Sequence, residues 1–103
     1  MLYHIDFRVQ YPPTMTQEEL FTIWSEEADA AEEGKKKGIV VSVWKCVGTR
    51  RVIAIVDVES PDQLDQVIMD LPIVKKLGQY VNIEVTSLRR YEDFATDLKA
   101  RKN

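Results

Sequence analysis

One acidic side chain of this chain falls where a core residue is expected. Residues of a helix that lie three, four or seven apart share a face, because each residue turns the helix by about 100°. Over residues 16–37 this spacing places Glu27 near the middle of an apolar stripe made of Leu20, Ile23, Trp24, Ala31 and Gly34. Burial raises the pKa of a carboxyl group toward the range useful for a general base or acid. Glu27 is therefore the candidate catalytic residue; the alternative is a structural carboxylate that bends to the edge of the stripe or pairs with an arginine.

Two consecutive arginines are candidates for binding an anionic substrate. Arg50 and Arg51 stand at the start of a β-rich run, where successive side chains point to opposite faces. We therefore expect one of them to point toward the helices and the other away. An arginine fork matches a carboxylate, so either residue is a candidate for substrate binding; a surface or dimer-interface role is the alternative for each.

His4 and Trp24 complete the set of candidate substrate-binding residues. His4 shares the polar face of the first strand with Asp6 and Arg8, and histidine titrates near neutrality unaided. This face lies opposite the helices, so we expect it to be solvated in a lone subunit. The alternative for His4 is a hydrated interface between two subunits. Trp24 lies on the stripe of Glu27, where it either packs in the core or lines a pocket.

Composition excludes several classes of function. The net charge is -3 and the basic residues are scattered, which does not favour nucleic-acid binding. The single cysteine, Cys46, excludes an intrachain disulfide, and no histidine or cysteine cluster has the spacing of metal ligands. No glycine pattern is typical of phosphate binding, and no serine lies in a nucleophile motif. We expect neither metal nor cofactor.

The chain shows no targeting or membrane signal. Residues 1–9 alternate polar and apolar side chains, unlike a secretory signal peptide, and no apolar run approaches the ~20 residues of a membrane span. We expect a cytoplasmic protein that does not enter membranes.

The first half of the chain predicts a strand, a helix and a hairpin. Residues 2–10 alternate as in a half-buried strand. Thr16 and Glu19 form a capping box that starts a helix, which runs to about Lys37 with Gly38 as its stop. The β-rich runs 39–47 and 50–58 follow, and the two residues between them predict a tight antiparallel hairpin.

The second half predicts one more helix and one more strand. Ser60 is the expected N-cap and Pro61 the first helical residue of a helix that ends at Pro72. Residues 73–79 are expected to form a loop with room for one short helical turn. The last strand spans 80–88, with Val81, Ile83 and Val85 on one face.

The resulting order, βαββαβ, predicts a single α+β domain over residues 1–103. A four-stranded antiparallel sheet with both helices on one face, the ferredoxin-like arrangement, connects these elements by short links. The other face of the sheet would be open, so we expect at least a dimer. The charged tail, residues 89–103, carries apolar side chains only at a few positions, and is expected to be a mobile end or a short helix that docks on a neighbouring subunit.

Several short stretches resemble the muconolactone isomerase family. They are MLYH at 1–4, Glu26-Glu27, Gly38, Trp44, Gly48, VDVESPDQL at 56–64, MDLP at 69–72 and IEV at 83–85. The resemblance implies a ferredoxin-like fold of the dimeric α+β barrel type, an assembly of dimers, and cofactor-free proton transfer on an unsaturated lactone in aromatic catabolism. Glu27 matches the acidic residue of that family. Arg50 and Val52 replace its pocket tyrosine and asparagine, and Val40, Val41 and Ser42 replace an aromatic and basic cluster.

These observations leave three functions open. The first is a cofactor-free isomerase or related lyase that acts on a small anionic lactone or enolisable carbonyl compound, with Glu27 as the base and an arginine as the anchor. The second is a cofactor-independent oxygenase of the dimeric α+β barrel group, by analogy of fold. The third is a non-catalytic oligomer that binds a small ligand.

Overall fold

The sheet of the computed structural model, which describes residues 1–102, has four antiparallel strands. Neighbouring strands follow the order β2-β3-β1-β4. The strands are β1 (Leu2–Val9), β2 (Val40–Lys45), β3 (Arg51–Asp57) and β4 (Val81–Leu88). This is the strand order of a ferredoxin-like α+β domain, and the prediction of that fold is confirmed.

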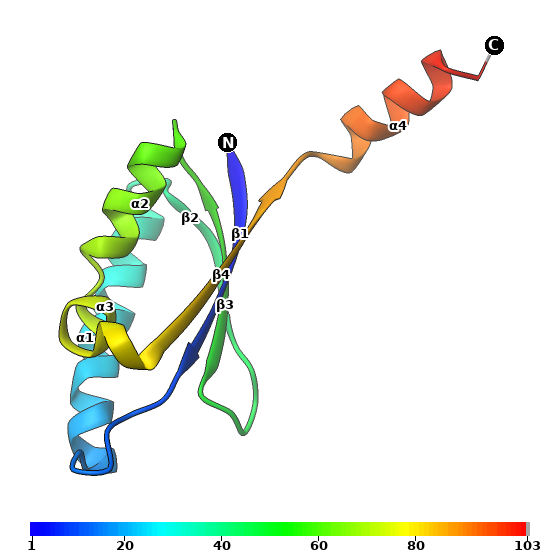
Figure 1. Ribbon diagram of the computed structural model, residues 1–103. Coiled ribbons are helices and arrows are strands. Elements are labelled where there is room, and N and C mark those ends of the chain that lie inside the picture. The colour runs from blue at the N-terminus through cyan, green and yellow to red at the C-terminus, as the bar shows by residue number, and fades with distance from the viewer. Residues whose placement is uncertain (103) are drawn as a thin grey trace.

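Three helices form a second layer on one face of the sheet (Figure 1). They are α1 (Gln17–Lys36), α2 (Pro61–Met69) and α3 (Pro72–Leu77), the last followed by the 3₁₀ turn η1 (Gly78–Tyr80). The capping signals read from the sequence are present, because the hydroxyl of Thr16 accepts a hydrogen bond from the Glu19 N–H and that of Ser60 from the Gln63 N–H. Gly38 has a φ of 78° directly after α1, a conformation that favours glycine.

The sheet register fixes which side chains face the helices. Tyr3, Ile5 and Phe7 of β1 lie opposite Val56, Ala54 and Val52 of β3, and these side chains share the helix-facing side. The core consists of two adjoining clusters, one centred on Tyr3, Ile5, Ala54, Val56, Val58 and Leu64 and the other on Val9, Leu20, Ile23, Ile73 and Leu77. The alternation predicted for the first strand is confirmed.

Two predicted connections differ from the structure. The β2–β3 link is not a two-residue hairpin: β2 ends at Lys45 and β3 begins at Arg51, and a turn closed by the Thr49 N–H on the Cys46 carbonyl lies between them. The segment expected to be mainly a loop forms α3 and η1. Pro72 does not end α2, which stops at Met69, but instead occupies the first turn of α3, where its missing N–H costs nothing.

A fourth helix, α4 (Tyr91–Ala100), projects away from the two layers (Figure 1). The Cα radius of gyration is 16.3 Å, whereas a compact domain of this length has about 13 Å, and the projecting helix accounts for the difference. Tyr91, Phe94 and Leu98 are spaced as one helical face and remain exposed. Of the two forms expected for the tail, residues 91–100 take the helical one, whereas Asn103 lies outside the described residues.

Candidate functional site

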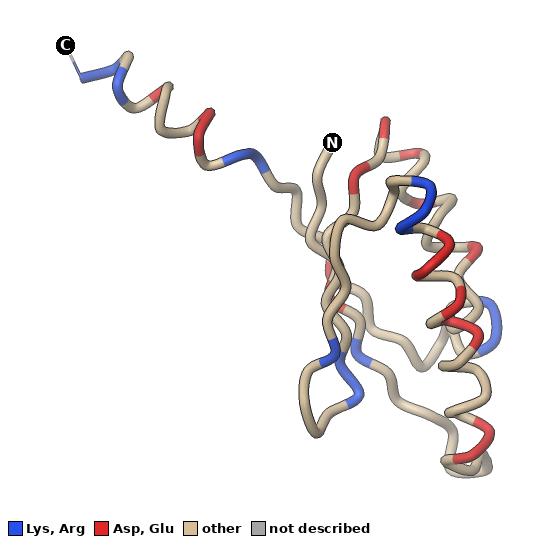
Figure 2. Tube along the Cα trace, turned by 180° about the vertical axis from the view of Figure 1, so that it is seen from behind, with Lys and Arg blue, Asp and Glu red and all other residues tan. Residues whose placement is uncertain are grey.

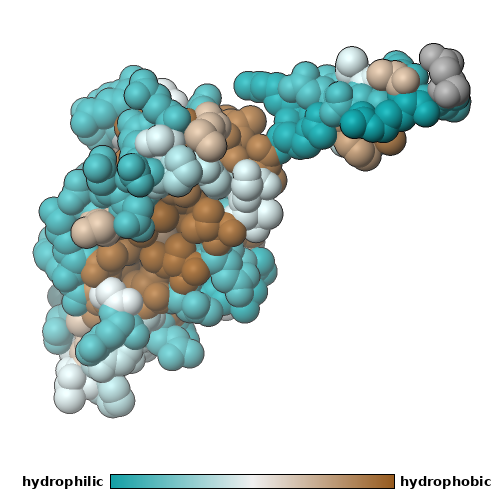
Figure 3. Space-filling model, turned by 45° about the horizontal axis from the view of Figure 1, so that its top comes forward, coloured by the Kyte–Doolittle hydropathy of each residue, from teal (hydrophilic) through white to brown (hydrophobic). Residues whose placement is uncertain are grey.

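A cavity of about 1230 Å³ lies between the helix layer and the sheet. Apolar side chains of both layers form much of its wall, and they gather in the hollow between the layers (Figure 3). The wall includes Phe7 and Val43 from the sheet, Trp24 and Ala31 from α1, and Ile68 from α2. An apolar hollow with a few polar groups is the usual form of a small-ligand site.

Glu27 is the carboxylate that the helical spacing placed in this cavity, and the structure confirms that position. Its Oε2 accepts a hydrogen bond of 3.1 Å from the backbone N–H of Ile73 in the first turn of α3, a group that has no partner within its own helix. Within residues 1–102 this is the only hydrogen bond of the carboxylate, so Oε1 is left for a ligand. Burial raises the pKa of Glu27, and the Ile73 N–H opposes that rise.

A second glutamate joins α1 to α3. Both carboxylate oxygens of Glu26 accept hydrogen bonds from Lys76 Nζ, at 2.9 and 2.7 Å, on the exposed side of the contact. The side chain of Glu26 is 44% exposed although it is paired. The two neighbouring glutamates of α1 thus each bond to α3.

Arg50 is the arginine that points to the helix side, as alternation along the strand required. Its Nε donates to the Val9 carbonyl at 3.1 Å, and its guanidinium carbon lies 5.4 Å from the centre of the Tyr11 ring. In the described part of the chain no carboxylate lies within salt-bridge distance of Arg50. Its terminal nitrogens are therefore available for an anion at the edge of the cavity.

Trp24 also lines the cavity, where its ring lies 5.9 Å from Lys45 Nζ. The structure therefore brings Glu27, Arg50 and Trp24 to one cavity. The sequence reasoning missed Lys45 and Tyr11, which belong to the same wall. The signal for Lys45 was present in the sequence, since Lys45 lies two residues after Val43 and therefore on the same face of the strand. Tyr11 follows a strand and precedes a proline, where no periodicity in the sequence predicts the direction of a side chain.

Arg51 and His4 lie on the opposite face of the sheet. Arg51 Nε donates to both oxygens of Asp6 at 3.0 Å, and its Nη2 donates to Oδ2 at 2.7 Å. Asp6 is only 5% exposed, although the sequence predicted this face to be solvated in a lone subunit. The structure does not bring Arg51 or His4 together with Glu27. A substrate-binding role for these two residues stays a prediction.

The Asp6–Arg51 pair makes stability depend on acidity. Hydrogen bonds from Arg51 lower the pKa of Asp6, with further contributions from the charges of Arg51, Arg8 and His4, while burial opposes the shift. A carboxyl group whose pKa is lower in the folded chain than in the unfolded chain stabilises the fold at any pH above its unfolded pKa, which is about 4. This stabilisation is lost as the pH falls through the pKa of the folded state. We expect Asp6→Asn to lower the melting temperature at pH 7 and to differ much less from wild type near pH 2. Thermal melts of both proteins across this range test the pair, and a constant difference at every pH would contradict its charge as the cause.

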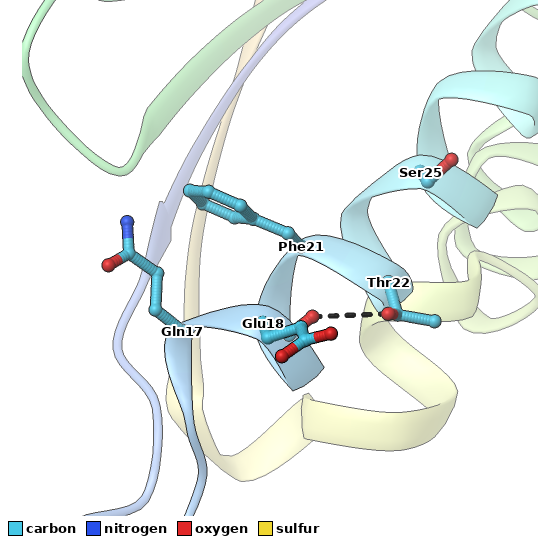
Figure 4. A pocket seen from close by; sticks show the side chains of 5 residues that line it. All are labelled: Gln17, Glu18, Phe21, Thr22 and Ser25. Carbon is cyan, nitrogen blue, oxygen red and sulfur yellow. Dashed lines mark hydrogen bonds between the residues drawn. The ribbon is translucent and has the colours of Figure 1, made fainter.

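A second, shallow depression lies on the first half of α1 (Figure 4). It is lined by Gln17, Glu18, Phe21, Thr22 and Ser25. The Thr22 hydroxyl already donates to the Glu18 carbonyl at 3.1 Å, and Phe21 is 57% exposed. We therefore assign no chemistry to it.

No group of three or more histidine, cysteine, aspartate or glutamate side chains is arranged to hold a metal ion within residues 1–102. Over the same residues, no helix combines the length and the apolar character that a membrane span requires.

The two layers define a ferredoxin-like α+β protein with an apolar cavity between helices and sheet. The family model described as muconolactone delta-isomerase matches residues 1–93, and the chain belongs to this family. The muconolactone Delta-isomerase 2 of Acinetobacter lwoffii is 31% identical over 91 residues, which cover 88% of this chain and 91% of the relative. The muconolactone Delta-isomerase of Acinetobacter baylyi is 30% identical and covers 94% and 97% of the two chains. The family resemblance read from the sequence is confirmed.

The crystal structure of a muconolactone isomerase superposes with a TM-score of 0.73 and 28% identity, covering 87% of this chain and 90% of that one. Most of α4 lies beyond the last residue that the family model matches. The projecting helix is thus largely outside the segment on which family membership rests.

Proposed function

We propose that this protein is a cofactor-free isomerase that moves a proton on a small anionic unsaturated lactone in aromatic catabolism. The observation that carries the proposal is the half-buried carboxylate of Glu27, which lines the cavity with one oxygen bonded to the Ile73 N–H and the other free. Relatives at about 30% identity are named muconolactone Delta-isomerases, which supports the same reaction class.

The proposed reaction needs one base and no redox partner. Glu27 removes a proton from a carbon next to the conjugated double bond, the electron pair of the broken C–H bond shifts the double bond, and the protonated Glu27 returns the proton to another carbon. The raised pKa strengthens the carboxylate as a base. Arg50 holds the substrate carboxylate, and Trp24 supplies an apolar wall that excludes water.

Incubation with muconolactone, followed by NMR, tests this reaction class. We expect the double bond to migrate without consumption of oxygen. Oxygen uptake with an electron-rich phenol would instead indicate a cofactor-independent oxygenase, whereas ligand binding without turnover of any lactone would indicate a binding protein.

We also propose that the protein works as a homo-oligomer. The open face of the sheet carries Trp44, which is 66% exposed, beside the partly exposed Ile53 and Ile55. Sheets with an apolar open face are commonly covered by another layer. The cavity exceeds the ~300–1,000 Å³ typical of ligand sites, which leaves room for a segment of a second copy such as the apolar side of α4.

The oligomer proposal predicts a solution mass well above that of one chain. Light scattering at micromolar concentration should give at least twice 11.9 kDa. Replacement of Trp44 by Asp should shift the mass toward the monomer, because a charge would then lie on the apolar face. A wild-type mass of 11.9 kDa across the concentration range would contradict the proposal.

A further inference from the structure

Two cations stand at one end of the cavity without an acidic partner. Lys45 closes β2 and Arg50 precedes β3, and both line the cavity. Basic positions occur at this end of the sheet as well as at the end of α1, on α3 and in the C-terminal segment (Figure 2). Arg51 and Arg8 at the same end are within ion-pair distance of Asp6, whereas no such pair involves Lys45 or Arg50 within residues 1–102.

The strand register makes Lys45 and Arg50 diagonal neighbours on two paired strands. Lys45 of β2 lies opposite Val52 of β3, and Arg50 stands two residues before Val52 in the chain. The Cys46 N–H bonds to the Arg51 carbonyl at 2.9 Å, so the strands stay paired up to this point. Diagonal neighbours of this kind have backbones roughly 7–8 Å apart, within reach of long side chains.

Both side chains are held in position and keep donors free. Arg50 uses Nε on the Val9 carbonyl, which leaves both terminal nitrogens as a fork. Lys45 Nζ donates to the Cys46 and Thr49 carbonyls, which leaves one of its three hydrogens. The rings of Trp24 and Tyr11 lie against these cations and offer flat walls for an unsaturated ligand.

We propose that Lys45 and Arg50 form a dianion subsite, which favours unsaturated substrates that carry two carboxylates over those that carry one. Each cation matches one carboxylate, the fork of Arg50 by two hydrogen bonds and Lys45 by one. A monocarboxylate leaves one of the two cations unmatched. The proposal rests on the proposed function in that it uses the same cavity, and it adds Lys45 as a residue that determines specificity.

Equilibrium binding of two simple aromatic acids tests the subsite without turnover. Benzoate carries one carboxylate and phthalate carries two on neighbouring ring carbons. Titration calorimetry of the full chain at pH 7 and low ionic strength should show phthalate binding at least about tenfold more tightly, the factor expected of one additional hydrogen bond between charged groups. Lys45→Met and Arg50→Met should each reduce the affinity for phthalate to about the affinity of the wild-type protein for benzoate.

Three variants separate this role from structural and general charge effects. Lys45→Arg keeps the charge and should keep the preference for phthalate even if Lys45→Met disturbs the hairpin. Lys36→Met removes the same charge from an exposed position of α1 and should change neither affinity. Glu27→Gln should retain the preference, because binding of the two acids does not need the base. A failure of the isomerase proposal would appear separately, as absence of lactone turnover by the wild-type protein.

The subsite would be refuted by wild-type protein that binds benzoate as tightly as phthalate, or that binds neither at millimolar concentration. Equal weakening of both ligands in Lys45→Met would also overturn it, since that result assigns Lys45 to general attraction or to the hairpin.

Discussion

Replacement of Glu27 by glutamine is expected to lower turnover by about 100-fold or more, the usual contribution of a positioned general base. Glutamine keeps the shape of the side chain and an oxygen that accepts the Ile73 N–H bond, but it cannot take a proton. Ligand affinity should change little, so the loss should appear in kcat with KM nearly constant. Steady-state kinetics on the lactone identified by NMR give both constants.

The same substitution separates a catalytic carboxylate from one that only caps α3. The pKa of Glu27 is higher in the folded chain than in the unfolded chain, so protonation of Glu27 stabilises the fold at low pH. This contribution is lost as the pH rises through the pKa of the folded state. Glu27→Gln should therefore melt at the same temperature as wild type or higher at pH 7. Glu27→Leu removes the acceptor of the Ile73 N–H and serves as the structural control. Full activity in Glu27→Gln would remove this residue from the mechanism.

Arg50→Ala is expected to weaken binding of a carboxylate ligand by about 1.5 to 3 kcal/mol, the range for a hydrogen bond to a charged group. Melting should change little, because Arg50 is exposed and its one side-chain hydrogen bond within residues 1–102 goes to the Val9 carbonyl at the end of β1. Calorimetric titration together with thermal melts gives the two quantities for one protein preparation.

The neighbouring arginine supplies a matched control. Arg51→Ala removes the same side chain one residue later, but from the opposite face and from a buried aspartate. It should lower the melting temperature and, if the ligand binds in the cavity of Glu27, leave ligand affinity nearly unchanged. A loss of affinity would instead support the substrate-binding role predicted for Arg51. If Arg50→Ala instead behaves like Arg51→Ala, with lost stability and unaltered affinity, Arg50 belongs to the structural network and not to the site.

The sequence predicted the parts of the site that depend on local periodicity. Thr16 and Ser60 mark helix starts because their hydroxyls satisfy N–H groups three residues away, a purely local interaction. Glu27 could be placed in the cavity because a long helix has a regular face, and Arg50 and Arg51 could be separated because strands alternate.

The missing parts depend on contacts between distant segments. Helix α3 has six residues, too few for a helical period to appear in the sequence, and so the Ile73 N–H that binds Glu27 was not foreseen. Asp6 was expected to be solvated because its strand alternates, but its burial comes from Arg51, which is 45 residues away and reaches it through strand pairing. The wider β2–β3 turn was missed because the two residues Gly48 and Thr49 also suit a tight hairpin.

The structure of the protein with a bound carboxylate tests most directly whether the cavity of Glu27 is the reaction site. We expect the carboxylate of the ligand on the terminal nitrogens of Arg50, its unsaturated carbons against Trp24, and a carbon that carries the transferred proton within reach of the free Oε1 of Glu27. A ligand bound instead on the open face of the sheet, beside His4 and Arg51, would contradict the account and move the site to the other side of the sheet.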